Sequence, residues 1–185
     1  IYIMIAITES DKPMTNEINP NLNICIVKEN QETGKKTWLY AKNIVTNDGD
    51  LFYAQQAASE TPTNDFTGAS GRMQVRTGAV TPAKTDVYTQ FTTPVSGSNK
   101  IIDATYPMTN DGDGDNTGAG TDIVTWRTSW TTGDFTANLI IGGCIHIGGA
   151  SPTTEALLTH FDITSFNKTA SDTLKIFVNH TFTGV

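Results

Sequence analysis

The stretch IVTWRTSW, at residues 123–130, decides the fold class that the sequence predicts. Its side chains alternate between two faces, with Val124, Trp126, Thr128 and Trp130 on one face and Ile123, Thr125, Arg127 and Ser129 on the other. A period of two residues is that of a β-strand, whereas a helix repeats about every 3.6 residues. We therefore predict a strand here, with both tryptophans directed toward a core or an interface.

Short apolar or alternating runs of this kind recur along the whole chain, separated by Gly, Pro, Asn and Asp turn signals. In the final run Leu174, Ile176, Val178 and His180 alternate with Lys175, Phe177, Asn179 and Thr181, which places His180 on the apolar side near the end of the strand. We predict strands at residues 1–8, 22–28, 37–46, 51–55, 72–77, 86–91, 100–105, 122–130, 135–147 and 173–182.

One segment, SPTTEALLTHF at residues 151–161, has the pattern of a short helix. Ser151 suits the N-cap, Pro152 suits the first helical position, and Glu155 places a negative charge in the first turns. Together with the strands, this predicts an all-β fold: an antiparallel, jelly-roll-like β-sandwich with long polar loops and one short helix. We expect a single domain over residues 1–185, with a loop-rich insertion around 56–121.

The composition excludes some partners. The chain has 185 residues and a net charge of -7, with 12 Lys and Arg against 19 Asp and Glu. Binding to phosphate groups takes its affinity from clustered Lys and Arg, and the one cluster is Lys35 beside Lys36. We therefore expect neither nucleic acid nor an anionic membrane surface as a partner. The apolar opening IYIMIAI is too short for a spanning helix.

The stretch NDGDGDNTGAGTD, at residues 110–122, comes nearest to a chemical motif. Counted from its first aspartate, carboxylates fall at the first, third, fifth and twelfth positions, which is the spacing of a calcium loop. These residues are Asp111, Asp113, Asp115 and Asp122. The sixth position is Asn116 where the turn wants Gly, and the twelfth is Asp where a bidentate Glu is usual. We favour a solvated turn over a cation site and expect no cofactor, with calcium as the open alternative.

Cysteine and histidine offer two further hypotheses. Cys144 and His146 are two apart on a predicted strand and face the same side, so they could ligate zinc or pair as nucleophile and base. The surrounding glycine-rich apolar run favours core packing instead. His160 and His180 could meet His146 in space as a three-histidine metal site. For Cys25 and Cys144 we favour buried free thiols over a single bridge.

The aromatic residues leave two alternatives open. Trp38, Tyr40, Trp126 and Trp130 could form a platform on which a sugar stacks, or they could fill a core and subunit contacts, which is the commoner use of aromatics in alternating strands. No P-loop, Rossmann fingerprint, H-E-x-x-H motif or G-x-S-x-G turn occurs in the sequence. We therefore expect that the chain is not an enzyme.

Two segments carry a resemblance to a known class of proteins: DIVTWRTSWTTGDFTANLIIGG at residues 122–143 and FNKTASDTLKIFVNHTFTGV at residues 166–185. They resemble small virion structural proteins of tailed bacteriophages, either capsid decoration or tail-associated proteins, in which a K-T-x-x-D-T-L run leads into a final alternating strand. The resemblance implies a β-sandwich that assembles with copies of itself or with a capsid or tail, and it brings no catalytic residues.

The sequence thus predicts a non-enzymatic virion protein. We expect a capsid decoration or cement protein that self-associates, most simply as a trimer, and bridges subunits of the major capsid protein. The alternatives are a tail or fibre component, with a tail protein as partner, and a β-sandwich module that binds carbohydrate on the host surface.

Overall fold

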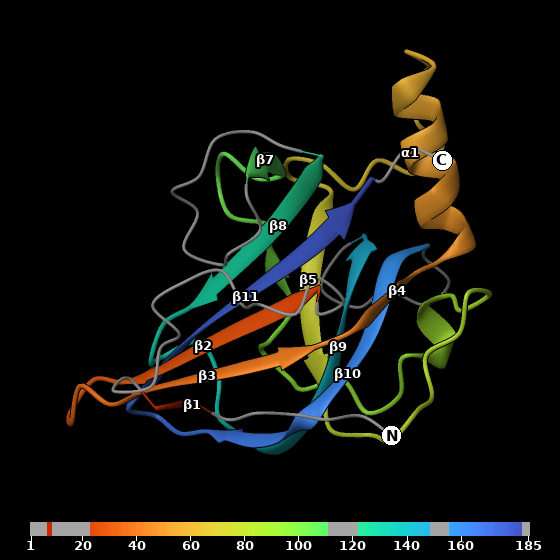
Figure 1. Ribbon diagram of the computed structural model, residues 1–185. Coiled ribbons are helices and arrows are strands. Elements are labelled where there is room, and N and C mark those ends of the chain that lie inside the picture. Colours follow the sequence, from red (N-terminus) through yellow and green to blue (C-terminus); the bar gives the residue numbers. More distant parts are fainter. Residues whose placement is uncertain (1–6, 9–22, 111–121, 149–155, 183–185) are drawn as a thin grey trace.

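Two antiparallel sheets pack face to face in the computed structural model, which describes residues 7–8, 23–110, 122–148 and 156–182 (Figure 1). The sheets enclose one main hydrophobic core, and a single α-helix stands at one end of the sandwich among the described residues. The predicted all-β sandwich with one short helix is therefore confirmed.

The sheets differ in strand order. Sheet A has six strands, in the order β1 (Ile7–Thr8), β3 (Lys36–Ala41), β2 (Ile24–Asn30), β11 (Asp172–Thr181), β8 (Ile123–Trp130) and β7 (Met108–Asn110). Sheet B has five strands, in the order β4 (Asn43–Val45), β10 (Leu157–Lys168), β9 (Ala137–Ile147), β5 (Gly71–Arg76) and β6 (Lys100–Ile101). The described helices are α1 (Asn47–Ala57) and the 3-10 turn η2 (Tyr88–Gln90).

The alternation in β8 has the predicted consequence. Trp126 and Trp130 are both fully buried between the sheets. β8 pairs with β11 without a register shift, from Leu174 opposite Trp130 to Thr181 opposite Ile123. Both strands therefore present one apolar face to the same core, and both lie between other strands of sheet A.

The predicted strand at 37–46 is two strands in two different sheets. Leu39 and Ala41 of β3 face the core from sheet A, and after Lys42 the chain enters β4 at the edge of sheet B. The chain therefore passes from one sheet to the other with a single residue between the two strands, as Figure 1 shows for β3 and β4.

The predicted strand at 51–55 is wrong, because these residues lie in α1. Thr46 caps the helix, since its hydroxyl accepts a hydrogen bond from the Gly49 amide at 3.2 Å, and acidic residues occupy the first turn. The helix packs closely on β10 at Gly49, where a Cβ would lie 2.3 Å from the Leu158 carbonyl oxygen. Phe52 then enters the core, where its ring meets that of Trp126 edge-on at 6.0 Å.

The predicted helix at 151–161 is wrong over its described part. Leu157–Lys168 form β10, which lies between β4 and β9, while Ser151, Pro152 and Glu155 lie outside the described residues. Leu157 and Leu158 are buried on opposite faces of sheet B. Pairing on both edges and burial on both faces outweigh the local helix pattern.

The segment 56–121 contains less strand than predicted at two places and more at another. Residues 86–91 contain only the 3-10 turn η2, and the predicted strand at 100–105 is reduced to β6. Met108–Asn110 form β7, which was not predicted, at the edge of sheet A. This segment thus supplies β5 and β6 to sheet B and β7 to sheet A.

Candidate functional site

The predicted calcium loop falls mostly outside the described residues. Asp111, Asp113 and Asp115 lie there, and Asp122 is exposed with its carbonyl accepting a hydrogen bond from the Phe182 amide at 2.8 Å. Within the part of the chain that the structure describes, no group of three or more His, Cys, Asp or Glu could hold a metal ion. The solvated turn that we favour, with calcium binding as the alternative, therefore stays a prediction.

The two cysteines cannot form a bridge with each other. Cys25 lies on the outer face of sheet A, opposite Tyr40 and Phe177, whereas Cys144 lies on the outer face of sheet B, opposite Gln74 and His160. Both are buried free thiols, as the sequence suggested. The sandwich core separates them.

The three histidines do not meet. His146 and His160 lie on the outer face of sheet B, while His180 faces the interior of the sandwich from the end of β11. The three-histidine metal site is therefore wrong. Cys144 and His146 do share a face, as predicted, but burial raises the pKa of the Cys144 thiol well above its usual value. A protonated thiol is a poor nucleophile and a poor zinc ligand.

A loop over residues 77–99, here called the covering loop, encloses part of the outer face of sheet B. Its Tyr88 and Phe91 pack with Cys144 and Leu157 in a small second cluster of buried apolar residues. The Tyr88 hydroxyl donates a hydrogen bond to Oε1 of Gln74 at 2.5 Å. The covering loop therefore gives β5, β9 and β10 a buried outer face as well as a buried inner one.

Arg76 is the centre of the polar contacts beneath the covering loop. Its side chain is fully buried, and its guanidinium donates to the carbonyls of Gly78 and Val80 and to the carboxylate of Asp162. Its Nε also donates to Nε2 of His160 at 3.1 Å. One cation thus ties the start of the covering loop to β10.

The protonation state of His160 follows from this contact. Because a guanidinium only donates, Nε2 of His160 must accept, so the proton of the neutral ring is on Nδ1. Nδ1 donates to Oδ2 of Asp86 at 2.7 Å, and Asp86 in turn accepts from the Ala83 amide. Burial, with the nearby Arg76 charge, lowers the pKa of His160 in spite of the Asp86 carboxylate. The ring is a neutral link between strand and loop.

We expect acid to destabilise the protein through its histidines. Burial lowers the pKa of His146 to about 4 and that of His180 to about 3, from an ordinary value of 6.5. Below pH 6.5 the unfolded chain binds protons that the folded chain excludes, so stability falls as the pH drops toward 4. From pH 6.5 to 5 each histidine should cost about 1 to 2 kcal/mol.

Urea unfolding midpoints measured between pH 7 and 4.5 check this expectation. The midpoint should fall less steeply with decreasing pH in His146→Gln than in the unmodified chain. Because the two slopes with pH are compared, a difference in stability between the two proteins at pH 7 does not affect the result. The pKa values of Asp134 and Asp172 are also lowered, but protonation of these carboxylates reduces stability only below about pH 4. Their contribution is therefore separate from that of the histidines. Stability that is constant from pH 7 to 5 would contradict the burial of neutral histidines.

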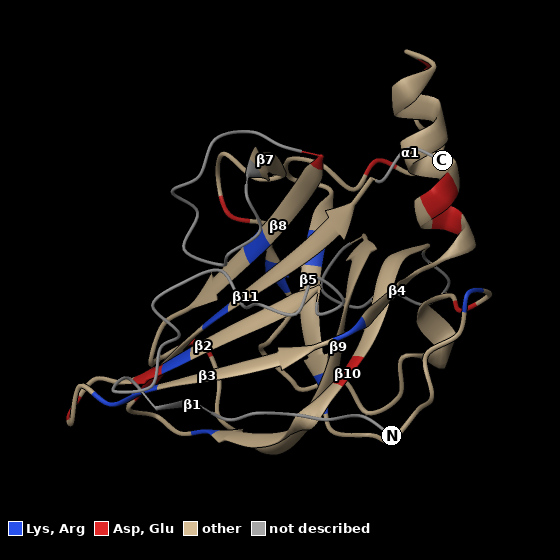
Figure 2. Ribbon diagram, viewed as in Figure 1, with Lys and Arg blue, Asp and Glu red and all other residues tan. Residues whose placement is uncertain are grey.

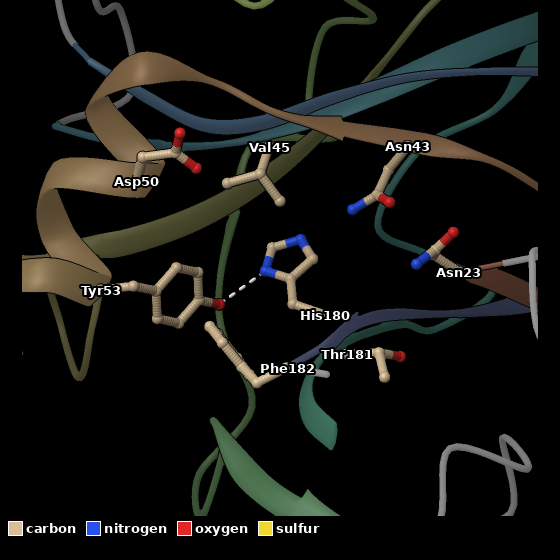
Figure 3. A pocket seen from close by; sticks show the side chains of 8 residues that line it. All are labelled: Asn23, Asn43, Val45, Asp50, Tyr53, His180, Thr181 and Phe182. Atoms are coloured by element: carbon tan, nitrogen blue, oxygen red, sulfur yellow. Dashed lines mark hydrogen bonds between the residues drawn. The ribbon is translucent and has the colours of Figure 1, made fainter. Parts of the chain in front are cut away.

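A pocket of about 440 Å³ opens at the end of the sandwich where α1 meets the ends of β4 and β11 (Figure 3). Its lining residues come from both sheets and the helix, and they are mostly polar: Asn23, Asn43, Val45, Asp50, Tyr53, His180, Thr181 and Phe182. The volume lies in the usual range of small-molecule sites. This pocket is the candidate functional site.

A chain of hydrogen bonds orients His180 on the wall of this pocket. The Trp126 indole N–H donates to the Tyr53 hydroxyl at 2.9 Å, and that oxygen lies 2.5 Å from Nδ1 of His180 (Figure 3). Burial raises the pKa of Tyr53, so its hydroxyl keeps its proton. The hydroxyl oxygen accepts from the indole, and Nδ1 of His180 is the one acceptor that the hydroxyl contacts among the described residues, so we assign the hydroxyl as the donor to Nδ1. The neutral ring then carries its own proton on Nε2, which is buried and has no hydrogen-bond partner.

The four aromatic residues do not form one platform, because they lie on two different faces of sheet A. Trp126 and Trp130 lie in the core, whereas Trp38 and Tyr40 are half-buried on the outer face of sheet A. The exposed aromatic at the pocket is instead Phe182, whose ring meets that of Tyr53 at 4.8 Å. The sequence pointed to His180 on an apolar face, but it gave no signal that Tyr53 would join it, because 51–55 resembled a strand.

Comparisons with known proteins leave the family open. A scan against protein-family models and searches of curated proteins and of solved structures found no match. Among the described residues, no helix has the length and apolar character needed to span a membrane. Figure 2 shows Lys and Arg as separate segments spread over both sheets and the loops.

Proposed function

We propose that this chain is a non-enzymatic structural protein of a virion, most simply a capsid decoration protein that self-associates and bridges capsid subunits. One observation carries the proposal. The two segments that resemble phage virion proteins supply β8, most of β9 and β11, and β8 pairs with β11 over its full length. The resemblance therefore covers a strand pair in sheet A, β8 and β11, and part of β9 in sheet B, rather than scattered surface loops.

The state of the reactive side chains supports a role without catalysis. The Cys144 thiol is buried with a raised pKa, and His160 is held between Arg76 and Asp86. Nδ1 of His146 donates to the carbonyl of Ile147 at 2.8 Å, within a buried environment. These groups hold the covering loop and the strands together, which suits a protein that acts through its surface.

The edges of the sheets favour association through side-chain surfaces. The outermost strands are β1 and β7 in sheet A and β4 and β6 in sheet B, each only two or three residues long among the described residues. Very short edge strands are one of the features that limit strand addition by another copy. Bridging between capsid subunits would then use faces and loops.

Co-sedimentation with particles tests the proposed place in the virion. The purified chain is mixed with separated heads and separated tails of a phage whose genome encodes it, and the pellets are compared. Binding to heads at a fixed ratio to the capsid protein supports decoration. Binding to tails alone supports the tail or fibre alternative, and binding to neither contradicts a virion role.

A further inference from the structure

We infer that the pocket between α1, β4 and β11 binds a neutral saccharide residue. The inference goes beyond the proposed virion function and does not depend on it. It rests on an oriented, unpaired hydrogen-bond donor in the pocket wall, on the uncommitted polar groups around it, and on one exposed aromatic ring.

His180 supplies the donor. It is the most buried of the lining side chains, at 3 % exposure, and its Nδ1 is occupied by the Tyr53 hydroxyl. Its Nε2–H lacks an acceptor among the described residues. A buried donor without a partner costs free energy, and a ligand oxygen that reaches the deepest part of the pocket would relieve that cost. Because this tautomer keeps a proton on Nε2, His180 favours a ligand atom that accepts a hydrogen bond.

The remaining polar groups surround this donor with both donors and acceptors. The side-chain amide of Asn23 and the side-chain hydroxyl of Thr181 make no hydrogen bond within the described structure. The side chain of Asn43 uses only its Nδ2, which donates to the Thr159 hydroxyl at 3.0 Å. Amides and hydroxyls of this kind match the hydroxyl groups of a sugar, each of which both donates and accepts. Phe182, 45 % exposed, offers an apolar ring against which one sugar face can pack.

The charges at the pocket favour a neutral ligand. Asp50 places a carboxylate in the wall, and its partner Lys84 neutralises it across a distance of 2.5 Å. His180 stays neutral over the physiological range because burial lowers its pKa to about 3. No unpaired cation lines the pocket within the described residues, so a sialic acid or a phosphate would find no positive charge there to pair with.

The test begins with a glycan array that carries neutral and sialylated oligosaccharides, probed with the labelled full chain. Free sugars corresponding to the bound spots are then titrated into the isotope-labelled protein and followed by NMR. The Trp126 indole N–H should shift, because it donates to the same Tyr53 oxygen that orients His180. The Trp130 indole, which donates to the Ser98 carbonyl, is the internal control and should not move.

Two surface variants separate this pocket from other sites. Phe182→Ala and Asn23→Ala should each weaken binding by about tenfold or more, and Leu139→Ala, which removes an exposed apolar side chain elsewhere on β9, should leave it unchanged. Absence of any neutral glycan among the bound spots overturns the inference. Binding of sialylated glycans alone also overturns it, and so does binding by both pocket variants that is as tight as that of the unmodified chain.

Discussion

Replacing Trp126 by alanine lowers the free energy of unfolding by about 3 to 5 kcal/mol. The side chain is fully buried between the sheets, its ring packs on Phe52, and its indole donates to the Tyr53 hydroxyl. The truncation therefore leaves a cavity and removes the donor that helps to hold Tyr53. Urea unfolding followed by far-ultraviolet circular dichroism measures the loss without relying on tryptophan emission.

Trp38→Ala is the matched control, because it also replaces a tryptophan by alanine, but on the opposite face of sheet A. Trp38 is half-buried on the outer face of sheet A, since its neighbours Leu39 and Ala41 face the core. We expect a loss less than half as large. Equal losses for the two variants would mean that the inner and outer faces of sheet A are wrongly assigned.

Arg76→Met lowers the free energy of unfolding by about 3 kcal/mol, through lost contacts rather than lost volume. Methionine fills much of the same space, but it leaves half-buried carbonyls of the covering loop and the buried Nε2 of His160 without a donor. Arg76→Lys should recover only part of this loss, because one ammonium cannot reproduce the planar fork that reaches Gly78, Val80 and His160 together. Urea midpoints and the slope of the transition measure both variants.

Asp162→Asn separates the charge pair from the rest of the Arg76 contacts. The Asp162 side chain is half exposed, so its ion pair with Arg76 is screened by water and should contribute less than about 1 kcal/mol. A loss in Asp162→Asn as large as that in Arg76→Met would show that the surface ion pair, and not the hydrogen bonds to the covering loop and His160, holds this region.

The strands that could be predicted are those whose pattern and packing agree. β8 and β11 each present alternate side chains to one core and pair with neighbours on both edges, so a period of two in the sequence corresponds to two faces in the structure. Trp126, Trp130 and His180 were assigned to the correct face on that basis. Long antiparallel strands in the interior of a sheet carry the strongest signal of this kind.

The errors arose where a short pattern fits two structures. LFYAQ at 51–55 is too short to distinguish a helix turn from a strand, and the decisive features are the Thr46 cap and the contact of Gly49 with Leu158, a residue distant in sequence. In β10, two buried faces erase the alternation, so Ala156, Leu157, His160 and Phe161 resembled one face of a helix. Tertiary contacts decided both cases.

The candidate pocket could be predicted only in part for the same reason. The position of His180 follows from the alternation of its own strand, but its partners come from α1 and β4. Tyr53 reaches His180 only because residues 47–57 are helical and dock at the end of the sandwich. Neither the helix nor its docking was predicted, so the hydrogen bonds that orient His180 could not be predicted.

The native mass of the purified full chain, measured by light scattering on a sizing column, tests the central claim most directly. In the proposed function the chain associates with copies of itself and bridges capsid subunits at a symmetric site. The proposed function predicts one discrete peak at a small multiple of the chain mass, most simply three, unchanged on dilution, with particles of matching size in electron micrographs. A monomer at every concentration tested would contradict it.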